Sequence, residues 1–168
     1  MSYIDTLISN YYSKGIVVDT NLLLLFLIGI YDINYIQSFK RTSKYNKEDY
    51  EIVNRIINSF SKIIVTPHII AEFSNLSFQL PEKLLENYFK SIFAHLNNID
   101  EIYIPKNVIL GNQILFKIGF TDLSIIELSK NKTHLVFTDD LPLTGYLNKF
   151  DCDLINLNYI RTELWLRK

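Results

Sequence analysis

The sequence predicts an α/β protein, a three-layer α/β/α sandwich with a central, mainly parallel sheet. Short runs of β-branched and aliphatic residues alternate along the chain with longer segments whose apolar residues recur every three or four positions. Such alternation is typical of βαβ units, whose helices cover both faces of a parallel sheet. No phosphate-binding glycine loop accompanies it, because the five glycines never fall into a G-x-G-x-x-G or P-loop spacing.

The composition indicates one domain, residues 1–168. With 48% hydrophobic residues, the chain can bury a sizeable core. A net charge of −1 excludes a polybasic arm or an acidic tail, but a local basic strip or a bound cation could still serve nucleic acid. The single cysteine, Cys152, excludes an internal disulfide and a multi-cysteine zinc site.

No segment predicts export or membrane insertion. The first residues lack a basic region followed by an apolar one, so we expect no signal peptide. The longest apolar run, residues 22–30, is far shorter than the roughly 20 residues of a membrane span. We therefore expect a soluble, cytoplasmic protein that does not contact a membrane.

Buried strands and amphipathic helices can be placed along the chain from these patterns. The expected strands are 15–19, 62–66, 134–138 and 152–157, with 100–104 as a short additional one. The expected helices are 2–13, 20–30, 47–60, one from Pro67 through Leu76, 81–96, 107–118, 121–130 capped by Thr121, and 141–150. Residues 33–47 should form a helix end and a surface loop, and 158–168 one or two helical turns.

The chain is organised around the stretch Gly15–Leu27. Its apolar strand ends abruptly at Asp19, and a second apolar run follows from Leu22 to Ile28. Asp19 should therefore lie where a strand ends and a buried helix begins. Taken alone, this aspartate is better explained as a helix N-cap than as a ligand-binding residue.

Acidic residues recur at equivalent positions in four separate segments. Those at a strand end or a helix start are Asp19, Glu72, Asp122 and the pair Asp139 and Asp140. If the strands are parallel, these positions share one edge of the sheet. Converging carboxylates raise one another's pKa and require a counter-charge, for which Mg²⁺ or Mn²⁺ is the natural choice. Acids at helix starts are common, however, and chance could supply two or three of them.

Four motifs together resemble the PIN domain family. They are VVDTNLLL (17–24), TPHIIAEF (66–73), GFTDLSIIELSK (119–130) and LVFTDDLPL (135–143), and DLINLNYIR (153–161) resembles the segment that closes the family's domain. Their order across almost the whole chain is far more specific than any single motif. The resemblance implies an α/β/α fold and Mg²⁺- or Mn²⁺-dependent nuclease activity, usually endonucleolytic on single-stranded RNA.

The resemblance also assigns roles to individual residues. By motif position, Asp19, Glu72 and Asp122 correspond to the first three family acids. The fourth follows a strand-end threonine by two residues; counting from Thr138 this selects Asp140, with Asp139 as a further contributor. Asp19, Asp122 and Asp140 would bind the metal, with Glu72 binding directly or through water, and one or two ions remain open. Asn21 and Ser124 match polar neighbours of the acids.

Substrate contacts require cations, and the loop 34–47 supplies them. The candidates are Lys40, Arg41, Lys44 and Lys47, and more weakly Lys14. Phe39 and Tyr45 lie nearby and could stack on bases. A mixed loop of lysine and tyrosine is nevertheless more often simply solvated.

The expected function is thus a metal-dependent endoribonuclease. Small PIN proteins often act as the toxin of a toxin–antitoxin pair, which implies an antitoxin protein as partner. Two alternatives stay open: a non-catalytic PIN-like module that binds nucleic acid or protein, and a metal-dependent DNA or flap nuclease. Exposed apolar surface on the helix around Leu84–Phe93 would indicate a homodimer or inhibitor interface.

Overall fold

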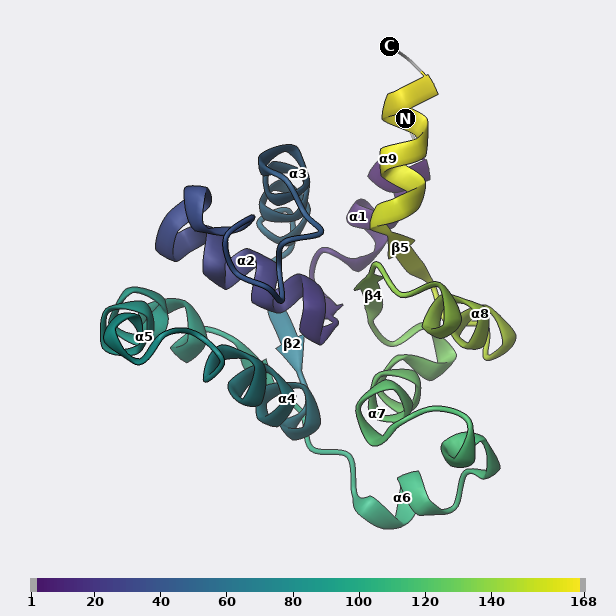
Figure 1. Cartoon of the computed structure of the whole chain (residues 1–168). Coiled ribbons are helices and arrows are strands. Elements are labelled where there is room, and N and C mark those ends of the chain that lie inside the picture. The colour runs from purple at the N-terminus through teal and green to yellow at the C-terminus, as the bar shows by residue number, and fades with distance from the viewer. Residues whose placement is uncertain (1–2, 167–168) are drawn as a thin grey trace.

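The structure, a computed structural model, describes residues 3–166 and confirms the α/β prediction. Its five strands form one all-parallel sheet in the order β3-β2-β1-β4-β5, consistent with a three-layer α/β/α sandwich (Figure 1). The strands are β1 (Ile16–Val18), β2 (Ile63–Val65), β3 (Asp100–Glu101), β4 (Leu135–Thr138) and β5 (Leu154–Asn156). Residue 2 of the first expected helix and residues 167–168 of the tail lie outside the described residues.

The strand β1 is the centre of the sheet. Ile16 pairs with Ile63 of β2 on one side and with Leu135 of β4 on the other. All three residues of β1 are fully buried, as expected for a central strand covered on both faces. From β1 the chain first proceeds outward to β2 and β3, then returns to β4 and β5. The gap between β1 and β4 is therefore the point where the strand order reverses, where open α/β sheets bind ligands.

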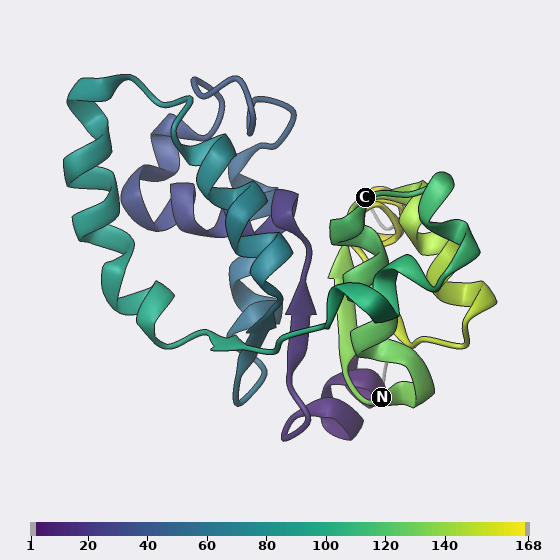
Figure 2. The same ribbon diagram turned by 90° about the horizontal axis from the view of Figure 1, so that it is seen from below.

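Helices connect all the strands. They are α1 (Tyr3–Tyr11), α2 (Thr20–Asp32), α3 (Lys47–Ile57), α4 (Pro67–Ser77), α5 (Glu82–Asn97), α6 (Lys106–Leu110), α7 (Phe120–Ser129), α8 (Leu141–Lys149) and α9 (Leu157–Leu166). Short 3₁₀ helices add η1 (Ile33–Tyr35), η2 (Gln113–Phe116) and η3 (Lys130–Lys132). Figure 2 shows α2–α5 and α6–α9 gathered on either side of β1. None of the helices in the described chain is long and apolar enough to cross a membrane.

The helix α2 is buried almost all round, as its sequence predicts. Every residue from Leu22 to Ile28 is buried, and α2 packs against α3, α4 and α5. Each buried leucine of this run contributes about 1.5–3 kcal/mol. The helix passes so close to α3 that a Cβ atom added to Gly29 would lie 2.2 Å from the ring of Tyr50. The helix that follows Asp19 is therefore held rigidly in the core.

The predicted helix 107–118 is wrong. The structure instead has α6, which ends before Gly111, and the 3₁₀ helix η2. Asn112 separates them because its side chain accepts a hydrogen bond from the N–H of Ile114 at 3.1 Å and turns the chain. The predicted cap at Thr121 is also wrong: α7 begins at Phe120, with Gly119 at the N-cap.

The helix α5, which contains the segment Leu84–Phe93, exposes a large apolar side chain. Tyr88 and Ile92 are fully buried, but Phe93 is exposed. Neighbouring residues on a helix point about 100° apart, so Phe93 leaves the face that Ile92 presents to the core. The helix α9 is longer than the one or two turns predicted for the tail, and β3 is shorter than the predicted strand 100–104. The remaining predicted strands and helices are confirmed with shifts at their ends.

Candidate active site

Asp19 lies at the carboxyl end of β1 and is the N-cap of α2. Its Oδ1 accepts a hydrogen bond from the N–H of Leu22 at 2.9 Å. Its Oδ2 accepts from the hydroxyl of Thr138 and, at 3.2 Å, from the N–H of Asp139, both from the end of β4. The cap interpretation is thus confirmed, and the same carboxylate also bridges the gap between β1 and β4.

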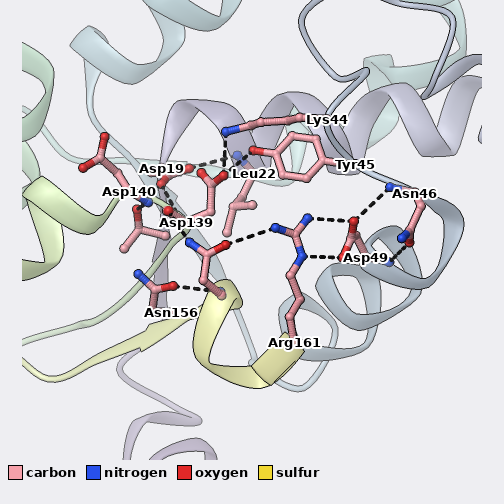
Figure 3. Close-up of polar contacts among 12 residues, drawn as sticks. Asp19, Leu22, Lys44, Tyr45, Asn46, Asp49, Asp139, Asp140, Asn156 and Arg161 are labelled. Atoms are coloured by element: carbon pink, nitrogen blue, oxygen red, sulfur yellow. Dashed lines mark hydrogen bonds and ion pairs between the residues drawn. The ribbon is translucent and has the colours of Figure 1, made fainter. Parts of the chain in front are cut away.

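Asp139 is the second buried acid at this gap, with 8% of the residue exposed. Its Oδ2 accepts hydrogen bonds from Nζ of Lys44 at 2.6 Å and from the hydroxyl of Tyr45 at 2.8 Å (Figure 3). Its Oδ1 is buried and has no hydrogen-bond partner. A buried carboxylate oxygen without a partner is costly, and it leaves lone pairs available to a cation.

The remaining acids belong to the same edge but contact other groups. Asp140 is the N-cap of α8, where its Oδ1 accepts from the N–H of Leu143 at 2.7 Å. Figure 3 shows its carboxylate turned away from those of Asp19 and Asp139. Glu72 on α4 accepts a hydrogen bond from the hydroxyl of Thr20 at 2.9 Å. Asp122 lies half-buried in the first turn of α7.

Mutual repulsion links these acids in two groups. Burial raises the pKa of Asp19 to about 7, and the charge of Asp139 adds to the increase, while hydrogen bonds from Thr138 and backbone amides oppose it. Burial likewise raises the pKa of Asp122 to about 6, with further contributions from Asp140 and Glu72. The negative charge of Asp139 therefore contributes to the raised pKa of Asp19, and that of Asp140 contributes to the raised pKa of Asp122.

The arrangement differs from a single ring of ligands. Among residues 3–166, no three acidic, histidine or cysteine side chains are close enough together to hold a metal ion. The donor set nevertheless suits Mg²⁺ or Mn²⁺, since it consists of carboxylate oxygens. Repulsion within each group and the unpartnered Oδ1 of Asp139 supply a need for positive charge.

The polar neighbours predicted from the motifs support the acids to different degrees. Thr138 is fully buried and, besides contacting Asp19, accepts a hydrogen bond from the N–H of Asp140 at 2.9 Å. Ser124 is also fully buried and donates to the carbonyl of Thr121 at 2.7 Å, so its hydroxyl is not solvated. Asn21 is half-buried in the first turn of α2.

Of the five predicted substrate cations, the structure brings Lys44 to the acids. Arg41 donates to Gln79 at 2.6 Å and Lys47 to Asn34 at 2.7 Å, both on the surface, and Lys40 is exposed. Lys14 precedes β1 and donates to the carbonyl of Lys132, so it lies at the opposite edge of the sheet.

The expectation that Phe39 and Tyr45 stack on bases is wrong. Both side chains are buried. The ring of Phe39 stacks on that of Tyr35 with centroids 6.5 Å apart. The hydroxyl of Tyr45 is committed to Asp139, and its ring lies 5.6 Å from the guanidinium carbon of Arg161. Burial next to Asp139 raises the pKa of Tyr45 above its usual range, so this hydroxyl keeps its proton and remains a donor.

Sequence reasoning missed the residues that connect Asp139 to the C-terminal helix. Asn158 donates to the carbonyl of Asp139 at 2.7 Å and accepts from Arg161 at 3.0 Å. Arg161 in turn holds Asp49 through two hydrogen bonds of 2.6 and 2.7 Å (Figure 3). One signal was available: Asn158 and Arg161 follow the last strand directly, at the same edge as the acids.

A comparison of the chain with family models, curated proteins and solved structures finds no match. The resemblance of its motifs to the PIN domain family therefore stays a hypothesis.

Proposed function

We propose that the chain is a divalent-metal-dependent endoribonuclease of the PIN type that hydrolyses phosphodiester bonds in single-stranded RNA. The observation that carries the proposal is the position of the acids. Asp19 follows β1 and Asp139 follows β4, on the two sides of the point where the strand order reverses. Glu72 and Asp122 extend the same edge from α4 and α7.

A metal ion fits these residues chemically. The carboxylates of Asp19 and Asp139, and those of Asp122, Asp140 and Glu72, would supply oxygen ligands to Mg²⁺ or Mn²⁺, with the unpartnered Oδ1 of Asp139 as one ligand atom. Because no three such side chains among the described residues lie close enough together to hold an ion, the acids would have to move closer when it binds. When bound, the ion would lower the pKa of a water molecule and offset charge on the phosphate oxygens. If the two groups of acids share an ion, the site holds one ion; if each group binds its own, the site holds two.

The chain's own residues orient the acids. The hydroxyl of Thr138 and the N–H of Leu22 fix the carboxylate of Asp19, and the buried helix α2 keeps it in place. Thr20 orients Glu72. Lys44 supplies positive charge at Asp139 and is the cation of its loop best placed to meet a substrate phosphate. Lys40, Arg41 and Lys47 would contact the strand further out.

A role as toxin is part of this proposal, with a small antitoxin protein as partner and the cytoplasm as its place of action. It rests on the resemblance of the motifs. A short reading frame adjacent to the gene whose product forms a complex with this chain and blocks cleavage would support it. A chain whose expression leaves growth unaffected while it cleaves RNA in the test tube would contradict the toxin role alone.

A non-catalytic module that binds nucleic acid or protein is the second candidate. Lys44 favours it, because an ammonium group paired with Asp139 neutralises one of the acids without a metal. The absence of a three-ligand group among the described residues favours it as well. Against it, burial and acidic neighbours raise the pKa of Asp19 and of Asp122, and such carboxylates destabilise a fold that does not use them.

The test is cleavage of end-labelled single-stranded RNA and DNA in Mg²⁺, Mn²⁺ or EDTA. We expect internal cleavage of RNA that EDTA abolishes and that Asp19→Asn and Asp122→Asn each reduce at least about 100-fold. Glu86→Gln, on the exposed surface of α5, is the matched control and should cleave normally. Cleavage that survives EDTA or both substitutions would refute a metal nuclease, and preferred cleavage of DNA would favour the DNA or flap nuclease.

A further inference from the structure

Two aromatic rings lie together at the start of the helices that carry Glu72 and Asp122. His68 is in the first turn of α4 and Phe120 is the first residue of α7. Their rings stack with centroids 6.1 Å apart and an interplanar angle of 30°. The hydroxyls of Thr66 and Ser124, 2.8 Å apart and buried, tie the two helix starts together beneath them. The pair of rings, here called the aromatic platform, is thus fixed to the frame of the acids.

The phenylalanine ring of the platform is open to solvent. Phe120 is 44% exposed, and Phe116, four residues earlier on the adjoining η2, is 93% exposed. The 3₁₀ helix η2 contacts α7, so Phe116 belongs to a segment that packs next to the helix of Phe120. Aromatic side chains of this size dominate interface energetics when they are covered, and here none of the described residues covers Phe116.

The segment that leads into Phe120 carries positive charge. Residues 102–121 include Lys106 and Lys117 and no aspartate or glutamate. Both lysines are exposed, and Lys117 directly follows Phe116. Exposed aromatic rings together with lysines are a combination that binds single-stranded nucleic acid, since bases stack on the rings while cations meet phosphates. The acids nearest to the platform in sequence, Glu72 and Asp122, are those that the proposed function assigns to a metal ion.

The platform also has a fixed relation to the acidic edge. His68 precedes Glu72 by four residues, one helical turn, so both side chains lie on the same face of α4. Phe120 precedes Asp122 by two residues in the first turn of α7. A base stacked on the platform would therefore have its phosphate beside the acids.

We propose that His68 and Phe120 form a binding surface for a base of single-stranded nucleic acid, which Phe116 and Lys117 extend to the neighbouring nucleotide. The surface takes over the role that the buried Phe39 and Tyr45 cannot fill. The inference rests on the proposed function for the direction of the strand, but base stacking itself requires neither a metal nor cleavage.

The test is a binding measurement in EDTA, where the proposed activity is silent. Fluorescence anisotropy would follow a short labelled single-stranded RNA, its DNA counterpart, and an abasic strand of equal length. Loss of one base stack should weaken binding about tenfold for Phe120→Ala, whereas Phe120→Trp should retain the affinity. Phe93→Ala, which removes an exposed ring from α5, is the matched control and should bind normally.

The abasic strand separates stacking from attraction to phosphates. The unmodified protein should bind it more weakly than RNA, and Phe120→Ala should make no further difference to that weaker binding. Equal loss on both strands, or no loss on RNA, would overturn the proposal. So would a Phe120→Ala variant that changes the oligomeric state in light scattering while its RNA affinity is intact, because the rings would then form a protein interface.

The outcomes distinguish this inference from the proposed nuclease. Binding that depends on Phe120 in a protein that cleaves nothing would leave the platform standing and refute the nuclease. Cleavage that depends on Asp19 with binding indifferent to Phe120 would do the reverse. His68→Ala should weaken binding less than Phe120→Ala, because His68 is half-buried and supports the exposed ring.

Discussion

Asp49 and Asp139 are two buried carboxylates at opposite ends of one hydrogen-bonded chain of residues, and their surroundings differ sharply. Asp49, 4% exposed, accepts from Arg161 on both oxygens and from the N–H of Asn46 at 2.9 Å. Asp139, 8% exposed, accepts two hydrogen bonds on Oδ2 and none on the buried Oδ1, and it lies beside a second acid, Asp19.

The comparison teaches what each acid contributes. Asp49 has a guanidinium matched to both its oxygens, a geometry that stabilises the folded state and fastens α9 to α3. Asp139 raises the pKa of Asp19 and lacks one partner, which costs stability. Destabilising groups of this kind are kept in proteins where they serve a function. Asp49 is therefore a structural residue, and Asp139 is a candidate functional residue.

The largest expected effect is a dependence of stability on pH that originates at Asp19. Its pKa is about 7 in the folded protein against a usual 3.8, so between these values the folded state binds more protons than the unfolded state. The free energy of unfolding should therefore fall as pH rises from about 4 to about 7, by up to about 4 kcal/mol from this group, and then level off. Urea denaturation in EDTA at several pH values measures it.

The variant Asp19→Asn isolates this contribution. Asparagine is as good an N-cap as aspartate and cannot ionise. The free energy of unfolding of the variant should therefore fall much less with rising pH, and at pH 8 it should exceed that of the unmodified protein. Asp122 acts in the same direction up to about pH 6 and should account for the remainder. A variant that declines as steeply as the unmodified protein would show that Asp19 does not carry the raised pKa.

Removal of each of the compared acids should have unequal effects on stability. Asp49→Ala leaves the buried side of Arg161 unpaired and should cost about 3 kcal/mol of unfolding free energy. Asp139→Asn removes repulsion with Asp19 and should change it by less than about 1 kcal/mol at pH 8. Denaturant midpoints at constant slope give both values, and equal losses would contradict the division between the two acids.

The smallest expected effect concerns metal affinity at Asp139. Its ion pair with Lys44 must open before a metal can use Oδ2, and the lysine side chain is 55% exposed, so solvent screens the pair. Loss of the pair in Lys44→Met should tighten Mn²⁺ binding by roughly fivefold, about 1 kcal/mol, in titration calorimetry. Lys47→Met, from the same loop, should leave it unchanged. Weaker binding in Lys44→Met would mean that the lysine supports the metal site.

The sequence was informative where the signal is local. The β-branched runs predict the strands, because a buried strand needs an apolar residue at nearly every position, and a parallel sheet then places Asp19 and Asp139 at one edge. The pairing of Asp139 with Asp19, and of Asp140 with Asp122, depends on side-chain directions that spacing does not encode. The predicted helix 107–118 is interrupted because the side chain of Asn112 accepts a hydrogen bond from the N–H of Ile114.

Partners far apart in the chain were beyond prediction. Lys44 and Asp139 are separated by 95 residues, and Arg161 and Asp49 by 112. Their contacts arise only when the loop after η1 and the helix α9 pack against the finished sheet. A lysine in a polar loop and an arginine near a chain end look the same in sequence whether they pair or remain solvated.

The central position of β1 sets when the acidic edge can exist. Asp19 and Asp139 are 120 residues apart, and β4, the second neighbour of β1, is among the last elements to be made. At roughly 5–20 residues per second, a ribosome needs on the order of 10 s to pass from one aspartate to the other. During that time the nascent chain contains Asp19 but not yet Asp139. If the chain cleaves RNA as proposed, a nascent copy would be unable to cleave it until translation of that copy is nearly complete.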